Sequence, residues 1–378
     1  MLLKRYILAA ALVLFAAALI SAGKKKEEPV LPDAYILVEC ETGTVLSEYN
    51  SAQRLNGCYM NKLMALLLIA EDINAGQYEL SDVLTASESV RGTSGSVIWL
   101  EPGDQLTVEE LLKSVIIGNA NDALTVLAEN SSGTVEDFTM DMNARAFDLG
   151  LRDTVYISPY GYYDEREYTT CADISMVCSE LSEYEFLRPY FCTWRDFVKE
   201  GRTELVSENT LSRTYHRHCG FKACHSDAAG YCIAECGTND VGLKFAAVVL
   251  GADSEDVSFG TAKRLINQGF SDYKVTAAVF PEDLLRPVTV RNGETSAVEL
   301  SFAERSDVVV PRGSSSLRTV SVLPAFLDAP LTKGQRVGKA AFYNGKELVF
   351  ETDIIVKNDV NKLSYGFILK KILYKLSE

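Results

Sequence analysis

All three histidines of the chain lie in one short stretch that also holds four cysteines. The stretch "YHRHCGFKACHSDAAGYCIAEC" contains His216, His218, His225, Cys219, Cys224, Cys232 and Cys236. Zinc takes four nitrogen and sulfur ligands, so this concentration could supply a metal site. The spacing matches no standard zinc motif, and neighbours on a strand alternate faces, which would separate Cys224 from His225. We therefore favour disulfides or free buried thiols over zinc, and we expect no metal and no other cofactor.

Cysteine chemistry depends on where the chain is located. Its nine cysteines leave at least one thiol unpaired. Residues 1–22 have the layout of a secretory signal, with Lys4 and Arg5 before an apolar run, and export favours disulfides. Retention as an N-terminal anchor is the alternative, because an apolar run of about 17 residues is the lower limit for a membrane span. The lysines that follow argue against retention, so we favour a cleaved signal and an exported protein.

Composition bounds the remaining possibilities. The chain has 378 residues, is 47% hydrophobic and carries a formal net charge of -15. This length allows two domains with separate cores. A nucleic-acid footprint needs clustered basic residues, which this acidic chain lacks, so we do not expect nucleic acid as a partner.

The elements that must position any site begin with a hairpin. Alternating apolar and polar residues on both sides of "ETG" predict two strands within residues 34–50. A very apolar, buried helix is predicted at 59–74, and two more follow from 107 and a third from 134, where threonines supply N-caps. Strands return from about residue 231, with another helix at 258–268. This order predicts one α+β domain whose sheet is closed by its N- and C-terminal strands.

The composition changes after residue 280. Short β-type runs separated by Gly, Pro and Asn predict a small all-β domain at 285–358. The last segment, 363–378, predicts an amphipathic helix with one apolar face and lysines largely on the other. Such a helix suits the surface of an anionic membrane, and packing on the β domain is the alternative.

Several segments resemble a known family in order and spacing. They are "ILVECETGTVLSEYNSAQRL", "GSVIWLEPGDQLTVEELLK", "NARAFDLGLRDTVYISPYGYYDEREYTTCADISMV" and "APLTKGQRVGK". They resemble the serine D-alanyl-D-alanine carboxypeptidases among the low-molecular-mass penicillin-binding proteins. The resemblance implies a β-lactamase/transpeptidase-like α+β domain, with an antiparallel sheet flanked by helices, at 34–275. It also implies an enzyme that trims the terminal D-alanine from peptidoglycan stem peptides through an acyl-enzyme.

The family's first motif, Ser-x-x-Lys, places a serine nucleophile and its lysine base on one face of a helix N-terminus. In this register the chain has Tyr59 at the nucleophile position and Lys62 at the base position. A phenol oxygen lies several ångströms farther from the backbone than a serine oxygen, and attack geometry tolerates errors of only about 1 Å. We therefore do not expect acyl transfer through Tyr59.

The other two motifs are altered in the same way. Ser-x-Asn becomes Asn119-Ala120-Asn121, which keeps the distal amide and loses the hydroxyl that shuttles a proton. Lys-Thr-Gly becomes Lys222-Ala223-Cys224, which keeps the charge and loses both the hydroxyl and the open glycine that lets substrate backbone approach.

Three coordinated losses of a hydroxyl predict a pseudoenzyme of the cell envelope. We expect it to bind a peptidoglycan stem peptide or a cell-envelope protein in a residual polar cleft. Two alternatives stay open: a hydrolase with a shifted nucleophile such as Cys58, and a scaffold in which Lys62, Asn121 and Lys222 only serve packing or solubility. Cys58 is turned about 100° from Tyr59 along a helix, which disfavours the first. A further hypothesis is that Cys58 and Cys224, which both border the family's cleft, form a disulfide.

Overall fold

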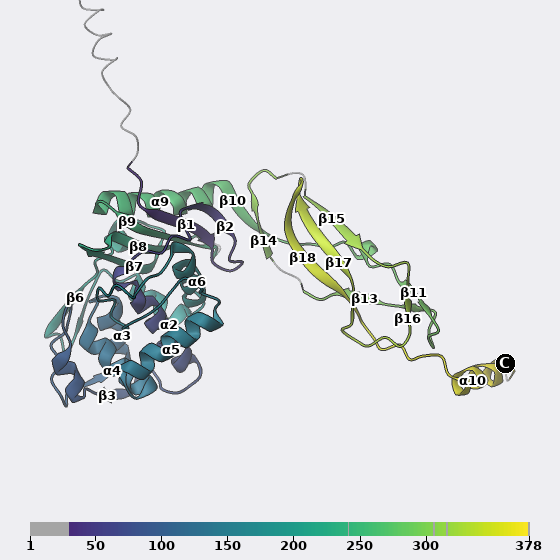
Figure 1. Cartoon of the computed structure of the whole chain (residues 1–378), viewed down its shortest axis with the longest axis horizontal. Helices are drawn as coiled ribbons and strands as arrows, with labels where there is room; N and C mark the ends of the chain where they lie inside the picture. Colours follow the sequence, from purple (N-terminus) through teal and green to yellow (C-terminus); the bar gives the residue numbers. More distant parts are fainter. Residues whose placement is uncertain (1–29, 241, 305–306, 315–316, 377–378) are drawn as a thin grey trace, which may run out of the picture.

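The computed structural model describes residues 30–240, 242–304, 307–314 and 317–376. The predicted signal or anchor at 1–22 lies outside these residues. An α+β domain is followed by a β domain and a terminal helix, which together form an elongated molecule (Figure 1). Over the described ranges, no helix has both the length and the apolar character that crossing a membrane requires.

The larger domain is built on a five-stranded sheet in the order β2-β1-β9-β8-β7. Its strands are β1 (Ala34–Glu39), β2 (Val45–Tyr49), β7 (His218–Ser226), β8 (Gly230–Thr238) and β9 (Lys244–Ala252). All neighbours pair antiparallel, and β1 pairs with β9 along its whole length. The prediction that the N- and C-terminal strands close the sheet is therefore confirmed.

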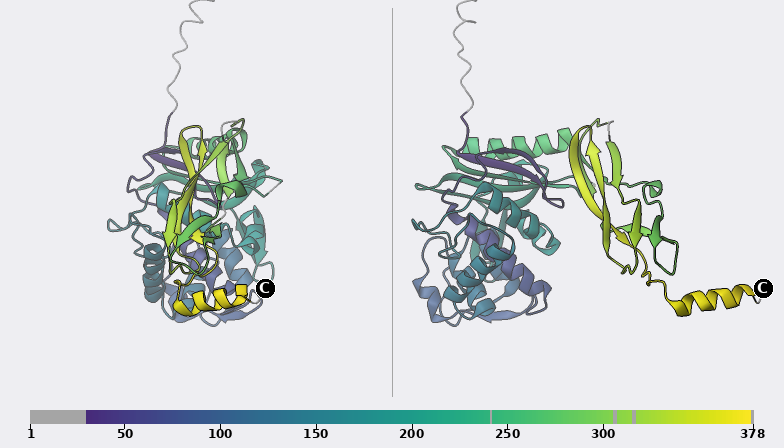
Figure 2. Two further views of the ribbon diagram at one scale, coloured as in Figure 1. Left: turned by 90° about the vertical axis from the view of Figure 1, so that its right-hand side faces the viewer. Right: turned by 45° about the vertical axis from the view of Figure 1, so that its right-hand side comes forward.

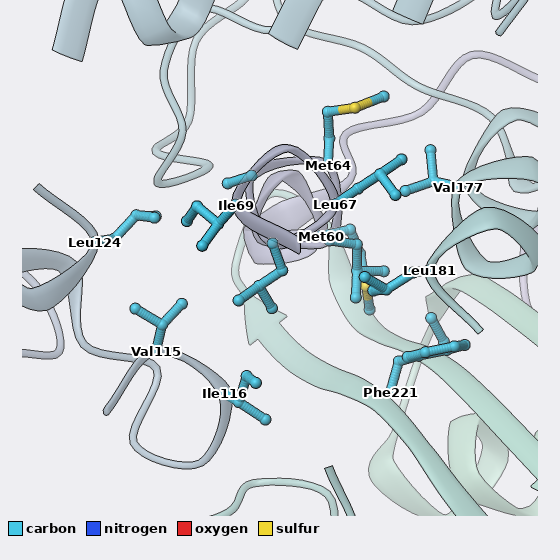
Figure 3. Packing of buried hydrophobic residues seen from close by; sticks show 14 of the residues in the cluster. Met60, Met64, Leu67, Ile69, Val115, Ile116, Leu124, Val177, Leu181 and Phe221 are labelled. Carbon is cyan, nitrogen blue, oxygen red and sulfur yellow. The ribbon is translucent and has the colours of Figure 1, made fainter. Parts of the chain in front are cut away.

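The two faces of the sheet are covered by different helices. On one face, α2 (Asn61–Asn74) is the central element, and all of its residues from Asn61 to Leu67 are buried. Figure 3 shows α2 end-on, surrounded by Val115, Leu124, Val177 and Phe221. The opposite face carries α9 (Glu255–Asp272), which packs on the sheet through Leu265 and Ile266.

Of the four helices around α2, the first and third begin where the sequence predicts, the second completes the predicted pair, and the fourth was not predicted. They are α3 (Val108–Ile116), α4 (Asn121–Ser132), α5 (Val135–Asp148) and α6 (Cys171–Leu181). Thr107 and Glu110 form the predicted capping box, and Thr134 caps α5. Helix α2 begins at Asn61, after the predicted start at residue 59, because the short 3-10 helix η1 (Cys58–Met60) precedes it.

Smaller elements complete the domain. They are β3 (Val83–Thr85), η2 (Glu88–Gly92), β4 (Gln105–Thr107), η3 (Glu185–Leu187), α7 (Arg188–Phe191), β5 (Arg195–Val198), β6 (Thr203–Val206) and α8 (Leu211–Thr214).

The second domain is all-β apart from one short 3-10 helix, as predicted. Its elements are β10 (Tyr273–Ala277), η4 (Glu282–Leu284), β11 (Val288–Arg291), β12 (Ala297–Val298), β13 (Leu300–Phe302), β14 (Asp307–Pro311), β15 (Leu317–Val322), β16 (Phe326–Asp328), β17 (Arg336–Asn344) and β18 (Glu347–Val356). They form a four-stranded sheet, β13-β18-β17-β15, and smaller sheets around a shared core that includes Val310, Phe342 and Ile354.

The chain ends in α10 (Tyr365–Leu376), which extends away from the β domain (Figure 2). None of its residues is buried. Leu369, Ile372 and Leu373 are 60%, 51% and 58% exposed, so its apolar face is largely uncovered.

Candidate active site

The fold brings residues of all three predicted motifs together between the start of α2, the turn before α4 and strand β7. Lys62 lies on the first turn of α2, and its Nζ donates to the backbone oxygen of Asn119 at 2.8 Å and to Asn119 Oδ1 at 2.7 Å. Lys222 lies close enough to affect the charge of Lys62 electrostatically. Lys222 Nζ donates to the carbonyl oxygen of Val115 at 3.2 Å.

The ammonium group of Lys62 is engaged by the protein itself. The residue is 1% exposed, and burial lowers its pKa well below the ordinary lysine value, helped by the like charge of Lys222. Asn119 has a left-handed backbone, with φ of 58°, and supplies both oxygens that accept from Lys62. The Lys62 amine, which the family pattern assigns as the base, is therefore held by Asn119. This asparagine stands at the position where the family has a serine hydroxyl.

Tyr59 is half-buried beside this lysine. Lys62 Nζ lies 5.2 Å from the centroid of the Tyr59 ring, so the amine meets the ring face. Burial raises the pKa of Tyr59, followed by smaller contributions from Cys58 and Cys224, which keeps the phenol protonated. This geometry gives the tyrosine the character of a packing residue.

Asn121 is held by a loop that the sequence reasoning did not single out. Its Nδ2 donates to the carbonyl oxygen of Ser94 at 2.7 Å and to the Tyr162 hydroxyl at 3.0 Å. The Tyr162 hydroxyl in turn donates to the same Ser94 oxygen at 2.6 Å. Asn121 Oδ1 is buried without a hydrogen-bond partner among the described residues. A buried unpaired acceptor is costly, so this oxygen is suited to an N–H donor from a ligand.

Strand β7 presents Lys222 and Cys224 on the face toward α2. Ala223, between them, packs in the buried cluster around α9 on the other face, as expected from the alternation of a strand. The side chain of Ala223 is therefore separated from those of Lys222 and Cys224.

Three further residues near the cleft were missed from the sequence. Glu208 is exposed and acts electrostatically on both Lys62 and Lys222. Ser94 and Tyr162 hold Asn121, and Tyr162 lies in the segment "SPYGYY". Gly161 in that segment has φ of 79°, and a Cβ there would lie 2.3 Å from the Cys58 carbonyl oxygen. In the sequence, Gly161 was a detectable sign that this segment approaches the active-site helix closely. No comparable sign pointed to Glu208.

The histidine-rich stretch is spread over different environments. His218 is buried and pairs with Glu235, whereas His225 is exposed and its ring lies 4.1 Å from that of Tyr231. Cys224 is 5% exposed, so it and His225 point apart as predicted. All nine cysteines are thiols. Among the described residues, no group of three or more histidine, cysteine and acidic side chains is arranged to hold a metal ion.

Comparison with known proteins assigns the class. The family model "D-alanyl-D-alanine carboxypeptidase" matches residues 22–254, and the model of the C-terminal domain of penicillin-binding protein 5 matches residues 274–362. The chain belongs to the D-alanyl-D-alanine carboxypeptidase family, as the sequence predicted.

Individual relatives cover nearly the whole chain. D-alanyl-D-alanine carboxypeptidase DacF of Bacillus subtilis is 29% identical over 343 residues, which is 89% of this chain and 88% of the relative. DacC of Escherichia coli is 29% identical over 362 residues, covering 92% and 89%. The solved structure of penicillin binding protein 5 from Haemophilus influenzae superposes with a TM-score of 0.81 at 22% identity. It covers 89% of this chain and 100% of that one. The predicted transpeptidase-like fold is thus confirmed.

Proposed function

We propose that this protein is a pseudoenzyme of the D-alanyl-D-alanine carboxypeptidase family, which binds the end of a peptidoglycan stem peptide without cleaving it. One observation carries the proposal: both oxygens of Asn119 hold the Lys62 amine, while Tyr59 occupies the nucleophile position. The lysine thus lacks the hydroxyl from which it would take a proton, and the nearest phenol presents its ring.

The size of the expected defect supports inactivity. General-base activation contributes about 10²- to 10⁴-fold to such reactions, and misplacing a reacting atom by about 1 Å costs about 10²-fold. Here the nucleophile and the shuttle hydroxyl are both replaced, at Tyr59 and Asn119, whereas the Ala223 side chain packs on the other face of the sheet. These losses affect one proton-transfer and binding unit, so restoring one group leaves the other missing.

The residual cleft supports binding of a peptide that ends in a carboxylate. Lys222 is a buried cation, and the carboxylate of a bound peptide would supply a negative charge to balance it. The unpaired Asn121 Oδ1 offers an acceptor for a peptide N–H. Glu208 is exposed, so it leaves the mouth of the cleft acidic and disfavours ligands with many negative charges.

A shifted nucleophile at Cys58 is the second candidate function. A hydrogen bond with Cys224 lowers the pKa of Cys58, which favours the reactive thiolate. Against this, Cys58 is 1% exposed and its thiol contacts β7. A non-catalytic scaffold without a peptide site is the third.

The proposal extends to the cell envelope and its membrane. The uncovered apolar face of α10 and its lysines support contact with an anionic membrane surface, on the outer side of the cell if residues 1–22 act as an export signal. Neutralising both Lys370 and Lys371 by substitution with Gln should weaken binding to vesicles rich in anionic lipid by roughly thirtyfold, from about 1 kcal/mol per basic residue. Equal binding of both forms to these vesicles would contradict membrane contact.

Calorimetric titration with an N-acylated peptide ending in D-Ala-D-Ala tests the peptide-binding proposal, combined with an assay for released D-alanine. We expect saturable binding and no release. Release of D-alanine at a rate typical of enzymes would support the shifted nucleophile, and absence of binding would support the scaffold.

A further inference from the structure

Three thiols form a continuous series at the edge of the cleft. Cys58 begins η1, Cys224 lies on β7 and Cys232 lies on β8. All three belong to one buried cluster, and the Cys224 thiol lies close enough to those of Cys58 and Cys232 for both to affect its pKa. Cys224 and Cys232 are direct partners in the β7–β8 register. All three are at most 5% exposed.

The position of Cys58 is fixed by the backbone around it. Its φ is 52°, in the left-handed region that non-glycine residues rarely adopt, and its N–H donates to Asn56 Oδ1 at 2.9 Å. Gly161 packs directly on the Cys58 carbonyl oxygen. These contacts fix Cys58 at the start of η1, which packs against β7, so the proximity of Cys58 to Cys224 is built into the fold.

We propose that Cys58 and Cys224 form a reversible disulfide that ties the start of the active-site helix to β7 and closes this end of the cleft. The bridge would join the residue next to the nucleophile position to the residue that replaces the glycine of Lys-Thr-Gly. Because that glycine position is where the family's substrate backbone approaches, the oxidised protein loses space for a peptide and the reduced protein regains it.

The reaction needs an oxidant, which is a low-molecular-mass disulfide. The Cys58 thiolate attacks one sulfur of that disulfide and displaces one small thiolate, which takes up the proton from Cys58. Cys224 then attacks the Cys58 sulfur of the mixed disulfide, forms the protein bridge and displaces the second small thiol with the proton from Cys224. Two electrons pass from the two protein thiols to the small disulfide.

Electrostatics assigns the order of attack. A hydrogen bond with Cys224 lowers the pKa of Cys58, whereas burial raises the pKa of Cys224 well above its ordinary value. Cys58 is therefore the better initial thiolate and Cys224 the resolving thiol. Local opening of the loop around Gly161 would have to admit the oxidant, since Cys58 is buried.

A second series of thiols provides an internal control. Cys219 and Cys236 lie at the other end of β7 and β8, and Cys192, at the end of α7, has its thiol 3.7 Å from the His218 carbonyl oxygen. The pKa of Cys219 is raised to about 12, and that of Cys192 is raised as well. These thiols are away from Tyr59, so their oxidation would leave the cleft unchanged.

The test is oxidation of the full chain with an excess of oxidised glutathione, followed by alkylation and mass mapping without reduction. We expect a peptide pair linked through Cys58 and Cys224, and a rise in melting temperature of roughly 5–10 °C that dithiothreitol reverses. Cys58→Ser should abolish the rise and Cys192→Ser should retain it. If a variant fails to fold, mass mapping of the disulfides in the unaltered chain still tests whether Cys58 and Cys224 are linked.

Three results would overturn the proposal. The first is alkylation of both Cys58 and Cys224 after complete equilibration with the oxidant. The second is a bridge from Cys224 to Cys232 in place of Cys58, and the third is bridging confined to Cys192 and Cys219. None of these results depends on whether the cleft binds a peptide, so failure here is distinguishable from failure of the proposed function.

Discussion

Two buried polar clusters beside strand β7 have opposite properties. At one end, His218 Nδ1 lies 2.7 Å from Glu235 Oε1, and His218 Nε2 lies 3.0 Å from the Phe191 carbonyl oxygen. Asn209 Nδ2 donates to Glu235 Oε2 at 2.8 Å. Nε2 donates to the carbonyl oxygen, and Nδ1 shares a hydrogen bond with the Glu235 carboxyl group, so both ring nitrogens have partners.

The cleft, by contrast, contains an incomplete cluster. Lys62 and Lys222 are two buried cations whose pKa values are lowered, first by burial, and Asn121 Oδ1 has no partner within the described structure. Polar atoms that are all paired serve the fold, whereas unpaired ones indicate a site that something else completes. The comparison therefore associates the His218 cluster with stability and supports the proposal that the cleft binds a ligand.

The largest expected effect is on stability at the His218 cluster. Glu235→Leu leaves His218 Nδ1 and Asn209 Nδ2 buried without their carboxyl partner, which should lower the free energy of unfolding by about 3 kcal/mol or more in denaturant titrations. Glu88→Gln, at the exposed pair with Arg91, is the matched control and should cost no more than about 0.5 kcal/mol. Equal losses in the two variants would contradict the comparison.

The next effect is on binding in the cleft. Lys222→Met removes the cation proposed to hold the peptide carboxylate, and it should weaken binding by roughly tenfold to a hundredfold in calorimetric titrations. Stability should change little, because a buried lysine with a lowered pKa costs free energy to retain. Lys263→Met on α9, at the opposite face of the sheet, is the control. If Lys222→Met were strongly destabilised while its affinity for the peptide stayed unaltered, Lys222 would serve the stability of the fold and not ligand binding.

A smaller effect is expected with pH. Burial lowers the pKa of His218, but Glu235 more than offsets this, so the folded pKa is raised above the ordinary value near 6.5. The stabilising contribution is therefore fully present below that value and is lost as pH rises through the folded pKa. Unfolding free energies measured from pH 6 to 9 should fall more steeply, or rise less, in the unaltered chain than in His218→Gln, because Lys62 and Lys222, with lowered pKa values, contribute the opposite slope to both chains. Identical slopes in the two chains would show that the pair is neutral.

The smallest effect is expected from restoring the nucleophile. Tyr59→Ser alone should produce no adduct with a labelled penicillin, because Asn119 still holds Lys62. Adding Asn119→Ser frees the amine and returns the shuttle hydroxyl, so the double variant should react faster than the single one. Full reactivity of Tyr59→Ser alone would show that Asn119 is no obstacle.

The sequence predicted the fold well because its signals are local. The capping box of Thr107 and Glu110, the buried helix α2 and the hairpins each depend on residues a few positions apart. It also predicted which motif positions meet, through resemblance to the family. It could not predict that Asn119 holds Lys62 with two oxygens, since this depends on a left-handed backbone 57 residues away in sequence. Nor could it indicate Glu208 or the pairing of His218 with Glu235, which the tertiary fold alone brings together.

The central claim is that the cleft retains binding groups and has lost its nucleophile. Intact mass measurement of the full chain after incubation with excess penicillin tests it most directly. We predict an unchanged mass, because neither Tyr59 nor Cys58 is placed and activated to open the lactam ring. A mass increase equal to one penicillin, mapped to either residue, would contradict the account.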